Sequence, residues 1–182
     1  MNIDETIQEI KKELWANMNG VASRRMREGG LVYHLNYGIE LPRLQEIARE
    51  FEPSHEVAQR LWHENVRECK LLAAMLMPVD RFSPDMADIW AGQIPNAEIA
   101  QHTVMNLFVR LPFAVDKAFE WIADSREMYQ LCGFLALTRF LMQGGELSER
   151  SLQELADQAQ SLKESPNLHL RKAVLNTLAR IQ

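Results

Sequence analysis

The chain has 182 residues, of which 47% are hydrophobic, and its 20 Lys and Arg against 25 Asp and Glu give a formal net charge of −5. This length and composition suit a single domain, residues 1–182, with a sizeable core, and no stretch is apolar enough for a membrane span. The acidic balance argues against a protein that coats polyanions over its whole surface, but it leaves room for a locally basic groove.

The N-terminal sequence MNIDETIQEIKKELW alternates charged and aliphatic residues, so we expect no secretory signal and a cytoplasmic location. Cys69 and Cys132 each lie in an apolar helical pattern without a second Cys or a His at metal spacing, which favours buried reduced thiols. The sequence has no Walker-type glycine loop, zinc motif or nucleophile elbow. We therefore expect no metal and no cofactor.

Aliphatic residues at helical spacing predict a first helix over about residues 3–17, which Asn19-Gly20 ends. A short basic helix follows and ends at Gly29-Gly30. Residues 34–42 have the character of a connection, after which the helical period resumes and stops before Pro53.

The rest of the chain predicts helix pairs separated by Pro or Gly. The pairs are 54–64 with 65–77, 83–93 with 96–111, 113–123 with 125–143, and 147–164 with 167–181. The second helices open on residues of the capping type at offsets of 31, 29 and 42 residues, namely Asn65, Asn96, Ser125 and Asn167.

A period of roughly 30–47 residues with two helices per unit is typical of HEAT-like arrays. No segment alternates like a strand over more than a few residues. The sequence therefore predicts an all-α fold, a HEAT-like α-α superhelix, which is a right-handed solenoid of antiparallel helix pairs. Trp15, Trp62, Trp90 and Trp121 lie toward the ends of first helices, which is more typical of packing between repeats than of a ligand platform.

Several short segments along nearly the whole chain share a pattern with one known family. They are Asn36-Tyr37-Gly38-Ile39-Glu40-Leu41-Pro42, Leu61-Trp62, Asn65-Val66-Arg67-Glu68, Leu71-Leu72-Ala73-Ala74, Trp121-Ile122 and Leu170-Arg171-Lys172-Ala173. In these segments the chain resembles the DNA alkylation repair family, the HEAT-like DNA glycosylases of the AlkD type. The resemblance implies DNA as the partner and, for active members, excision of cationic alkylated purines with the help of a carboxylate.

The resemblance places the catalytic Asp near the start of the helix predicted at 96–111, with a Trp one turn earlier. This sequence has Gln101 or His102 at the Asp position and Ala97 or Glu98 at the Trp position. The resemblance therefore extends to the scaffold and not to these two catalytic positions, which leaves enzymatic activity open.

Two more positions depart from the family pattern. The catalytic-face arginine falls near Leu131, and the second cleft tryptophan falls at Asn176. Glu98, Gln101 and His102 share one turn and remain the candidates for catalytic residues, although Glu98 is displaced by about one helical turn from the family carboxylate.

Basic and polar side chains gather on some of the predicted helices. In the last helix His169, Lys172, Asn176 and Arg180 fall within a narrow arc, opposite Leu170, Val174, Leu178 and Ile181. Such a stripe is either an ordinary solvated face or a phosphate-contacting one. Arg24, Arg25 and Arg27 form the densest positive cluster, and the same two interpretations apply to them.

The first hypothesis is a DNA alkylation repair-like protein that binds duplex or damaged DNA on its concave face. The expected DNA contacts are Arg24, Arg25, Lys70, Arg139, Arg171 and Lys172. The alternative is a non-catalytic HEAT-repeat scaffold that binds a protein or peptide, which the acidic balance and the missing catalytic set favour. Neither hypothesis involves a membrane.

Overall fold

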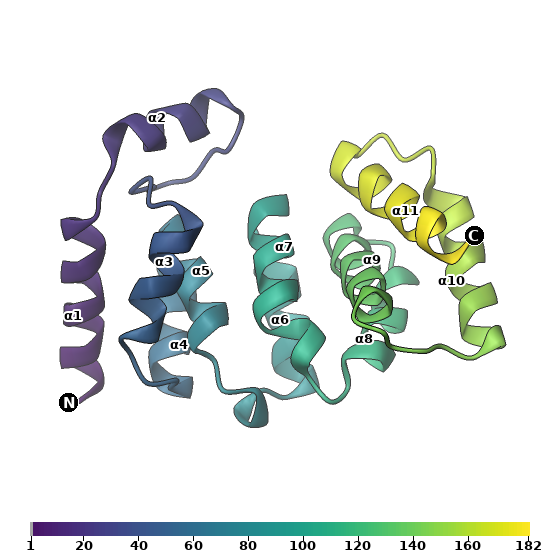
Figure 1. Ribbon diagram of the computed structural model, residues 1–182, viewed down its shortest axis with the longest axis horizontal. Helices are drawn as coiled ribbons and strands as arrows, with labels where there is room; N and C mark the ends of the chain where they lie inside the picture. Colours follow the sequence, from purple (N-terminus) through teal and green to yellow (C-terminus); the bar gives the residue numbers. More distant parts are fainter. Residues whose placement is uncertain (1) are drawn as a thin grey trace. The chain divides into compact units, whose positions relative to one another are not determined.

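The computed structural model describes residues 2–182, and these residues form helices without a β-strand (Figure 1). The predicted all-α class is confirmed. The chain divides into two compact units, Met1–Phe82 and Ser83–Gln182. Within residues 2–182, none of the helices combines the length and the apolar character that crossing a membrane requires.

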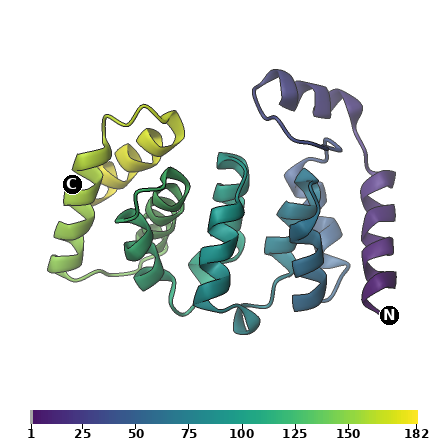
Figure 2. The ribbon, with the colours of Figure 1, turned by 180° about the vertical axis from the view of Figure 1, so that it is seen from behind.

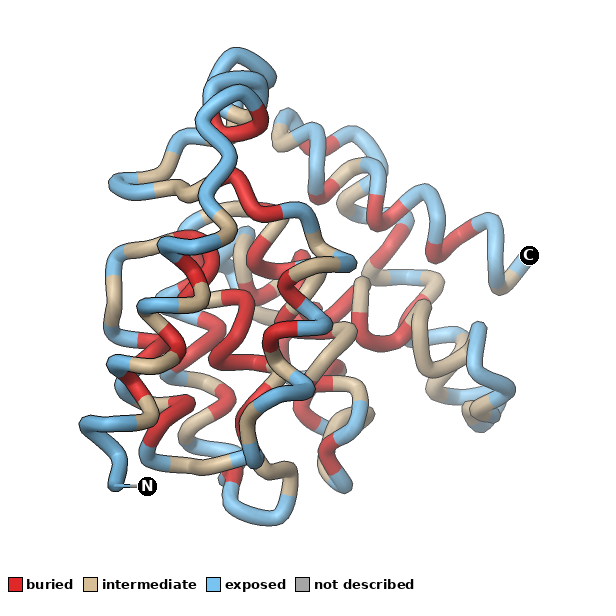
Figure 3. Tube along the Cα trace, turned by 60° about the vertical axis from the view of Figure 1, so that its left-hand side comes forward, coloured by how far each residue is buried: buried red, intermediate tan, exposed pale blue. Residues whose placement is uncertain are grey.

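The first unit consists of a run of short helices. They are α1 (Ile3–Ala16), α2 (Gly20–Glu28), α3 (Leu41–Arg49), α4 (His55–His63), α5 (Arg67–Leu76) and the 3₁₀-helix η1 (Val79–Arg81). Helix α1 packs on α4, and α5 packs on both α3 and α4. Helices α1, α3, α4 and α5 bury apolar residues, such as Ile7, Ile10 and Leu14 of α1, so the core of the unit lies between them (Figure 3).

A buried ion pair holds the connection that precedes α3. Arg67 and Glu68 are 2% and 0% exposed, and Arg67 Nη1 lies 2.9 Å from Glu68 Oε1. Arg67 Nη1 also donates to the carbonyl of Ile39, while the Glu68 carboxylate accepts the backbone N–H groups of Tyr37 and Ile39. Because a buried charge is costly unless it is paired and hydrogen-bonded, the pair and the connection depend on each other.

Gly38 lets the same connection approach α2 closely. Its φ is +70°, and a Cβ at this position would lie 2.2 Å from the carbonyl oxygen of Asn19 and 2.5 Å from the nitrogen of Ser23. The Asn19 N–H donates to the carbonyl of Tyr37, and the Ser23 hydroxyl donates to the carbonyl of Asn36. Helix α2 is therefore attached to the connection mainly through backbone groups.

The second unit consists of helix pairs. Its elements are α6 (Pro84–Gln93), α7 (Ala97–Asn106), the 3₁₀-helix η2 (Phe108–Arg110), α8 (Ala114–Ile122), α9 (Glu127–Met142), α10 (Glu149–Leu162) and α11 (Leu168–Ile181). Within this unit α6, α8 and α10 form one layer, and α7, α9 and α11 form the other (Figures 1 and 2). Helix α9 is central, because it packs on α6, α7, α8 and α11.

Close packing around α9 depends on Gly133, where a Cβ would lie 2.7 Å from the carbonyl oxygen of Ala118 on α8.

The predicted burial of both thiols is confirmed, since Cys69 and Cys132 are free and buried. Burial raises the pKa of each thiol to about 12, so neither is a ready nucleophile.

Two of the four predicted helix caps are correct. The side-chain oxygens of Asn96 and Asn167 accept backbone N–H groups at the starts of α7 and α11. The cap predicted at Asn65 is wrong, because α5 begins at Arg67. There the Arg67 N–H donates to the carbonyl of Leu35, which leaves the side chain of Asn65 without a capping role.

The cap predicted at Ser125 is also wrong. Helix α9 begins at Glu127, and the carboxylate of Asp124 accepts the N–H of Arg126 at a distance of 2.8 Å. The helix therefore begins two residues later than predicted, after a turn in which the Asp124 side chain accepts a backbone N–H.

The single helix predicted over residues 96–111 is interrupted. Helix α7 ends at Asn106, and Leu107, with φ −131° and ψ −63°, leads into η2. Phe108 is buried there, with its ring centroid 5.1 Å from that of Trp121. Packing of this aromatic pair accounts for the break, which the periodicity alone does not reveal.

The predicted packing role is confirmed for three of the four tryptophans. Trp62, Trp90 and Trp121 are 1%, 2% and 3% exposed. The prediction is wrong for Trp15, which is 56% exposed and donates its Nε1–H to the hydroxyl of Tyr37. Trp15 therefore contacts the connection before α3 through Tyr37 instead of packing between repeats.

Gly38→Ala should lower the free energy of unfolding by about 1–3 kcal/mol, because Ala strains at positive φ and its Cβ meets backbone atoms that cannot move independently. Urea unfolding followed by circular dichroism measures the effect. Gly20→Ala is the control, since a Cβ at Gly20 has nothing within 4 Å. Equal stability of the two variants would show that the close approach of the connection to α2 does not require Gly38.

Glu68→Gln should lower the free energy of unfolding by about 3–5 kcal/mol, because Arg67 would keep a buried charge without its counterion. The matched control is Glu52→Gln, at an exposed position between helices, which should stay within about 0.5 kcal/mol of the parent. A wild-type stability for Glu68→Gln in the same urea titration would show that the ion pair does not hold the unit together.

Candidate functional site

An open pocket of about 300 Å³ lies between α7, α9 and α11 of the second unit, and we call it the α9 pocket. Its apolar lining consists of Val104, Met105, Phe134, Leu135, Met142 and Ala173. Its polar lining consists of Gln101, His102, Thr138, Arg139 and Asn176. An apolar wall with a few convergent polar groups is the usual character of a binding site.

The α9 pocket collects several of the positions that the sequence singles out. Gln101 and His102 line it from α7, and Asn176 lines it from α11. Glu98 is not among the lining residues, and Leu131 is buried. The structure therefore brings together two of the three candidate catalytic residues with Asn176, and it leaves the only carboxylate of the three outside the pocket.

Arg139 sets the charge of the α9 pocket. Among the described residues, those that line the pocket include no Asp or Glu. Arg139 is partly buried, and its Nε is a buried donor without a hydrogen-bond partner in residues 2–182. Since a buried donor is costly when it is unsatisfied, the guanidinium of Arg139 has a hydrogen-bonding capacity that the described part of the fold leaves unused.

Thr138 is a lining residue that the sequence reasoning missed. Its Oγ1 lies 2.7 Å from Oγ1 of Thr177, whose own hydroxyl donates to the carbonyl of Ala173. The proton of Thr138 is therefore committed to Thr177, and Thr138 presents only acceptor lone pairs to the pocket. The available signal was the polar pair Thr138-Arg139 within the apolar run LCGFLALTRFLM.

The predicted polar stripe on α11 is confirmed as a surface. His169, Lys172, Asn176 and Arg180 are exposed, while Leu170, Val174 and Leu178 on the other side are buried. The alternation of buried and exposed positions along this last helix is visible in Figure 3. Because Asn176 lines the α9 pocket, Lys172 and Arg180 lie about one turn away on either side of it, roughly 6 Å along the helix axis.

The other predicted DNA contacts have different surroundings. Arg24 and Arg25 are exposed on α2. Lys70 is half-buried, its Nζ donates to the carbonyl of Trp62 at 2.7 Å, and burial lowers its pKa. Arg171 is half-buried and, two residues before Ala173 at 100° per residue, points away from the side of α11 that lines the pocket.

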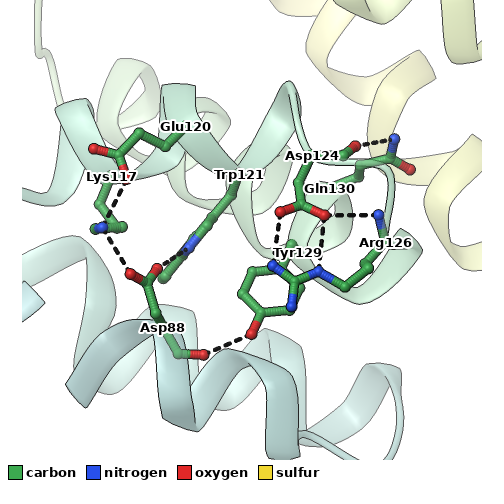
Figure 4. A network of polar contacts seen from close by, with 8 residues as sticks. All are labelled: Asp88, Lys117, Glu120, Trp121, Asp124, Arg126, Tyr129 and Gln130. Atoms are coloured by element: carbon green, nitrogen blue, oxygen red, sulfur yellow. Dashed lines mark hydrogen bonds and ion pairs between the residues drawn. The ribbon is translucent and has the colours of Figure 1, made fainter. Parts of the chain in front are cut away.

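A second polar cluster joins α6, α8 and the start of α9 (Figure 4). The Asp88 carboxylate accepts Trp121 Nε1–H at 2.8 Å and Lys117 Nζ at 3.0 Å, and the Tyr129 hydroxyl donates to the Asp88 carbonyl. Burial lowers the pKa of Lys117, but hydrogen bonds to Glu120 and Asp88 outweigh it and raise the pKa overall. Both carboxylate oxygens of Asp88 thus accept hydrogen bonds that connect α6 to α8.

The neighbouring carboxylate in Figure 4 is engaged in the same way. Asp124 accepts two guanidinium hydrogen bonds from Arg126, at 2.9 and 2.8 Å, which lower its pKa to about 2. Arg126 also lies 3.7 Å from the ring centroid of Tyr129. These contacts make the cluster a structural link between helices.

In the part of the chain that the structure describes, no three His, Cys, Asp or Glu side chains are placed to hold a metal ion.

Helices paired and stacked in two layers define a helical-repeat protein. Residues 10–181 match the family model described as DNA alkylation repair enzyme, so the chain belongs to the DNA alkylation repair family. No curated protein matches the chain in sequence.

The fold itself has a solved counterpart. This structure is described as a new family of proteins related to the HEAT-like repeat DNA glycosylases with affinity for branched DNA structures. It matches with a TM-score of 0.83 and 16% sequence identity, over 100% of this chain and 76% of the other. The match confirms the predicted HEAT-like repeat fold.

Proposed function

We propose that this protein binds DNA through the α7, α9 and α11 layer of its second unit and does not excise alkylated bases. The observation that carries this proposal is the α9 pocket, which lies in the layer that presents the polar stripe of α11 and has Arg139 but no carboxylate in its lining. A surface of this kind attracts the phosphate backbone and lacks the group that base excision requires.

Exposed Lys and Arg side chains would contact the phosphate backbone of the DNA. Lys172 and Arg180 extend from α11 beside the α9 pocket, and Arg180 Nη2 donates to the carbonyl of Leu141 at 3.3 Å, which fixes its position. In the first unit, Arg24 and Arg25 on α2 would add further phosphate contacts. Such contacts position the protein on DNA without reading its sequence.

DNA is the partner that the comparisons favour. Membership of the DNA alkylation repair family makes a nucleic acid the natural ligand, and the solved counterpart of the fold is described as having affinity for branched DNA structures. With a net charge of −5, the protein requires a local basic surface rather than a general attraction to polyanions. Because that counterpart is described as having affinity for branched DNA structures, we propose that junctions and other branched DNA bind this protein more tightly than linear duplex does.

Base excision is unfavourable for a chemical reason. Departure of an alkylated base leaves positive charge on the sugar, and an oriented carboxylate would have to stabilise that charge. The resemblance assigns Gln101 or His102 to the family's Asp position, neither of which is a carboxylate, and Glu98 lies outside the pocket lining.

Binding should fall steeply as salt rises, because bound cations release counterions from DNA. A fluorescence anisotropy titration with a four-way junction and a linear duplex measures the affinity at several salt concentrations. Lys172→Gln should weaken binding and reduce the slope of log K against log salt by about 1. Arg150→Gln, at an exposed site on α10, should leave the slope unchanged. Absence of binding to either DNA at low salt would refute the proposal and favour the protein-interaction scaffold.

Purified protein should release no 3-methyladenine or 7-methylguanine from methylated DNA above the buffer background, as measured by chromatography of the released bases. Loss of one well-placed electrostatic group typically lowers a rate by roughly 10²–10³. Glu98→Gln is the informative variant if release is seen. Activity that disappears in this variant would identify Glu98 as a relocated catalyst, and activity that survives would require a mechanism without a carboxylate from this helix.

A further inference from the structure

We propose that the α9 pocket binds a phosphate group through Arg139, in place of the cationic base that a carboxylate-bearing pocket would accept. The proposal rests on the DNA-binding function above and names the part of the DNA that enters the site. Its starting point is the buried Nε of Arg139, which has no hydrogen-bond partner in residues 2–182.

The charge of the pocket selects an anion. Arg139 takes part in no side-chain hydrogen bond or ion pair within the described residues, and no acidic residue lines the pocket with it. A guanidinium is always protonated and offers a planar fork of donors that matches two phosphate oxygens. A phosphate therefore fits the charge of this lining.

The neighbouring polar groups fit the same ligand. The amides of Gln101 on α7 and Asn176 on α11 can each donate a hydrogen bond to a phosphate oxygen from opposite sides of α9. Thr138 does not take part as a donor, because its proton goes to Thr177. The donors thus come from three helices, and the packing of α9 against α7 and α11 holds them in place.

The apolar wall accounts for the rest of the volume. The pocket of about 300 Å³ is larger than a phosphate alone, and Val104, Met105 and Met142 offer a surface for an uncharged group attached to it. A deoxyribose next to a backbone phosphate is such a group. Free phosphate shares the chemistry of the anion but would leave the wall uncovered, so the two sources can be separated by experiment.

The test uses NMR of arginine side chains in the full-length protein, with Arg139→Lys to assign the Nε–Hε signal of Arg139. The four-way junction and inorganic phosphate are added separately. A shift of the Arg139 signal with both ligands supports a phosphate site that DNA occupies. A shift with phosphate alone supports the anion site with free phosphate as its source. An unchanged signal with both ligands overturns the proposal.

Binding measurements separate this proposal from the proposed function. Arg139→Gln should weaken junction binding by about 10-fold, as expected for loss of a charged hydrogen bond, while Arg150→Gln should have no effect. Thermal unfolding checks that both variants fold. If the junction binds Arg139→Gln as tightly as wild type and the Arg139 signal stays unchanged, DNA binding stands and the phosphate site is wrong. If no DNA binds but phosphate shifts the Arg139 signal, the phosphate site stands and the proposed DNA binding is wrong.

Discussion

Helix α9 must satisfy four neighbours at once, because it packs on α6, α7, α8 and α11. This constraint explains its composition, with apolar residues on most sides and Gly133 where α8 approaches most closely. Thr138 and Arg139 in its C-terminal half line the α9 pocket, and Thr138 also bonds to Thr177 of α11. The packing of α9 against α11 thus helps to place the polar groups that line the pocket.

The first unit depends on a different interaction. The Arg67–Glu68 pair is buried and binds backbone groups of the connection before α3, so the charges organise a loop rather than form a site. Buried charges often indicate catalysis, but every group here has a partner within the fold. The same reasoning applies to Asp88, whose two carboxylate oxygens accept hydrogen bonds from Trp121 and Lys117 within the fold.

The proposed function depends on what lines the α9 pocket. Gln101 and His102 line it, and the resemblance to the family assigns one of them to the position of the catalytic Asp. Among the described residues, no carboxylate lines the pocket. Binding of the DNA backbone needs only cations, whereas excision needs an oriented carboxylate, so our proposal gives this scaffold the first role without the second.

Helical periodicity and proline positions were enough to predict the all-α class, the helix pairs and the exposed stripe on α11, because these depend on residues near one another in the chain. Tertiary contacts decided the rest. The start of α5 at Arg67 is supported by the carbonyl of Leu35, which accepts the Arg67 N–H. Trp15 is exposed and donates to the hydroxyl of Tyr37, which is distant in sequence. The joining of Arg139 to Asn176 in one pocket was likewise decided by the packing of α9 against α11, since residues so distant in sequence meet only when the helices pack.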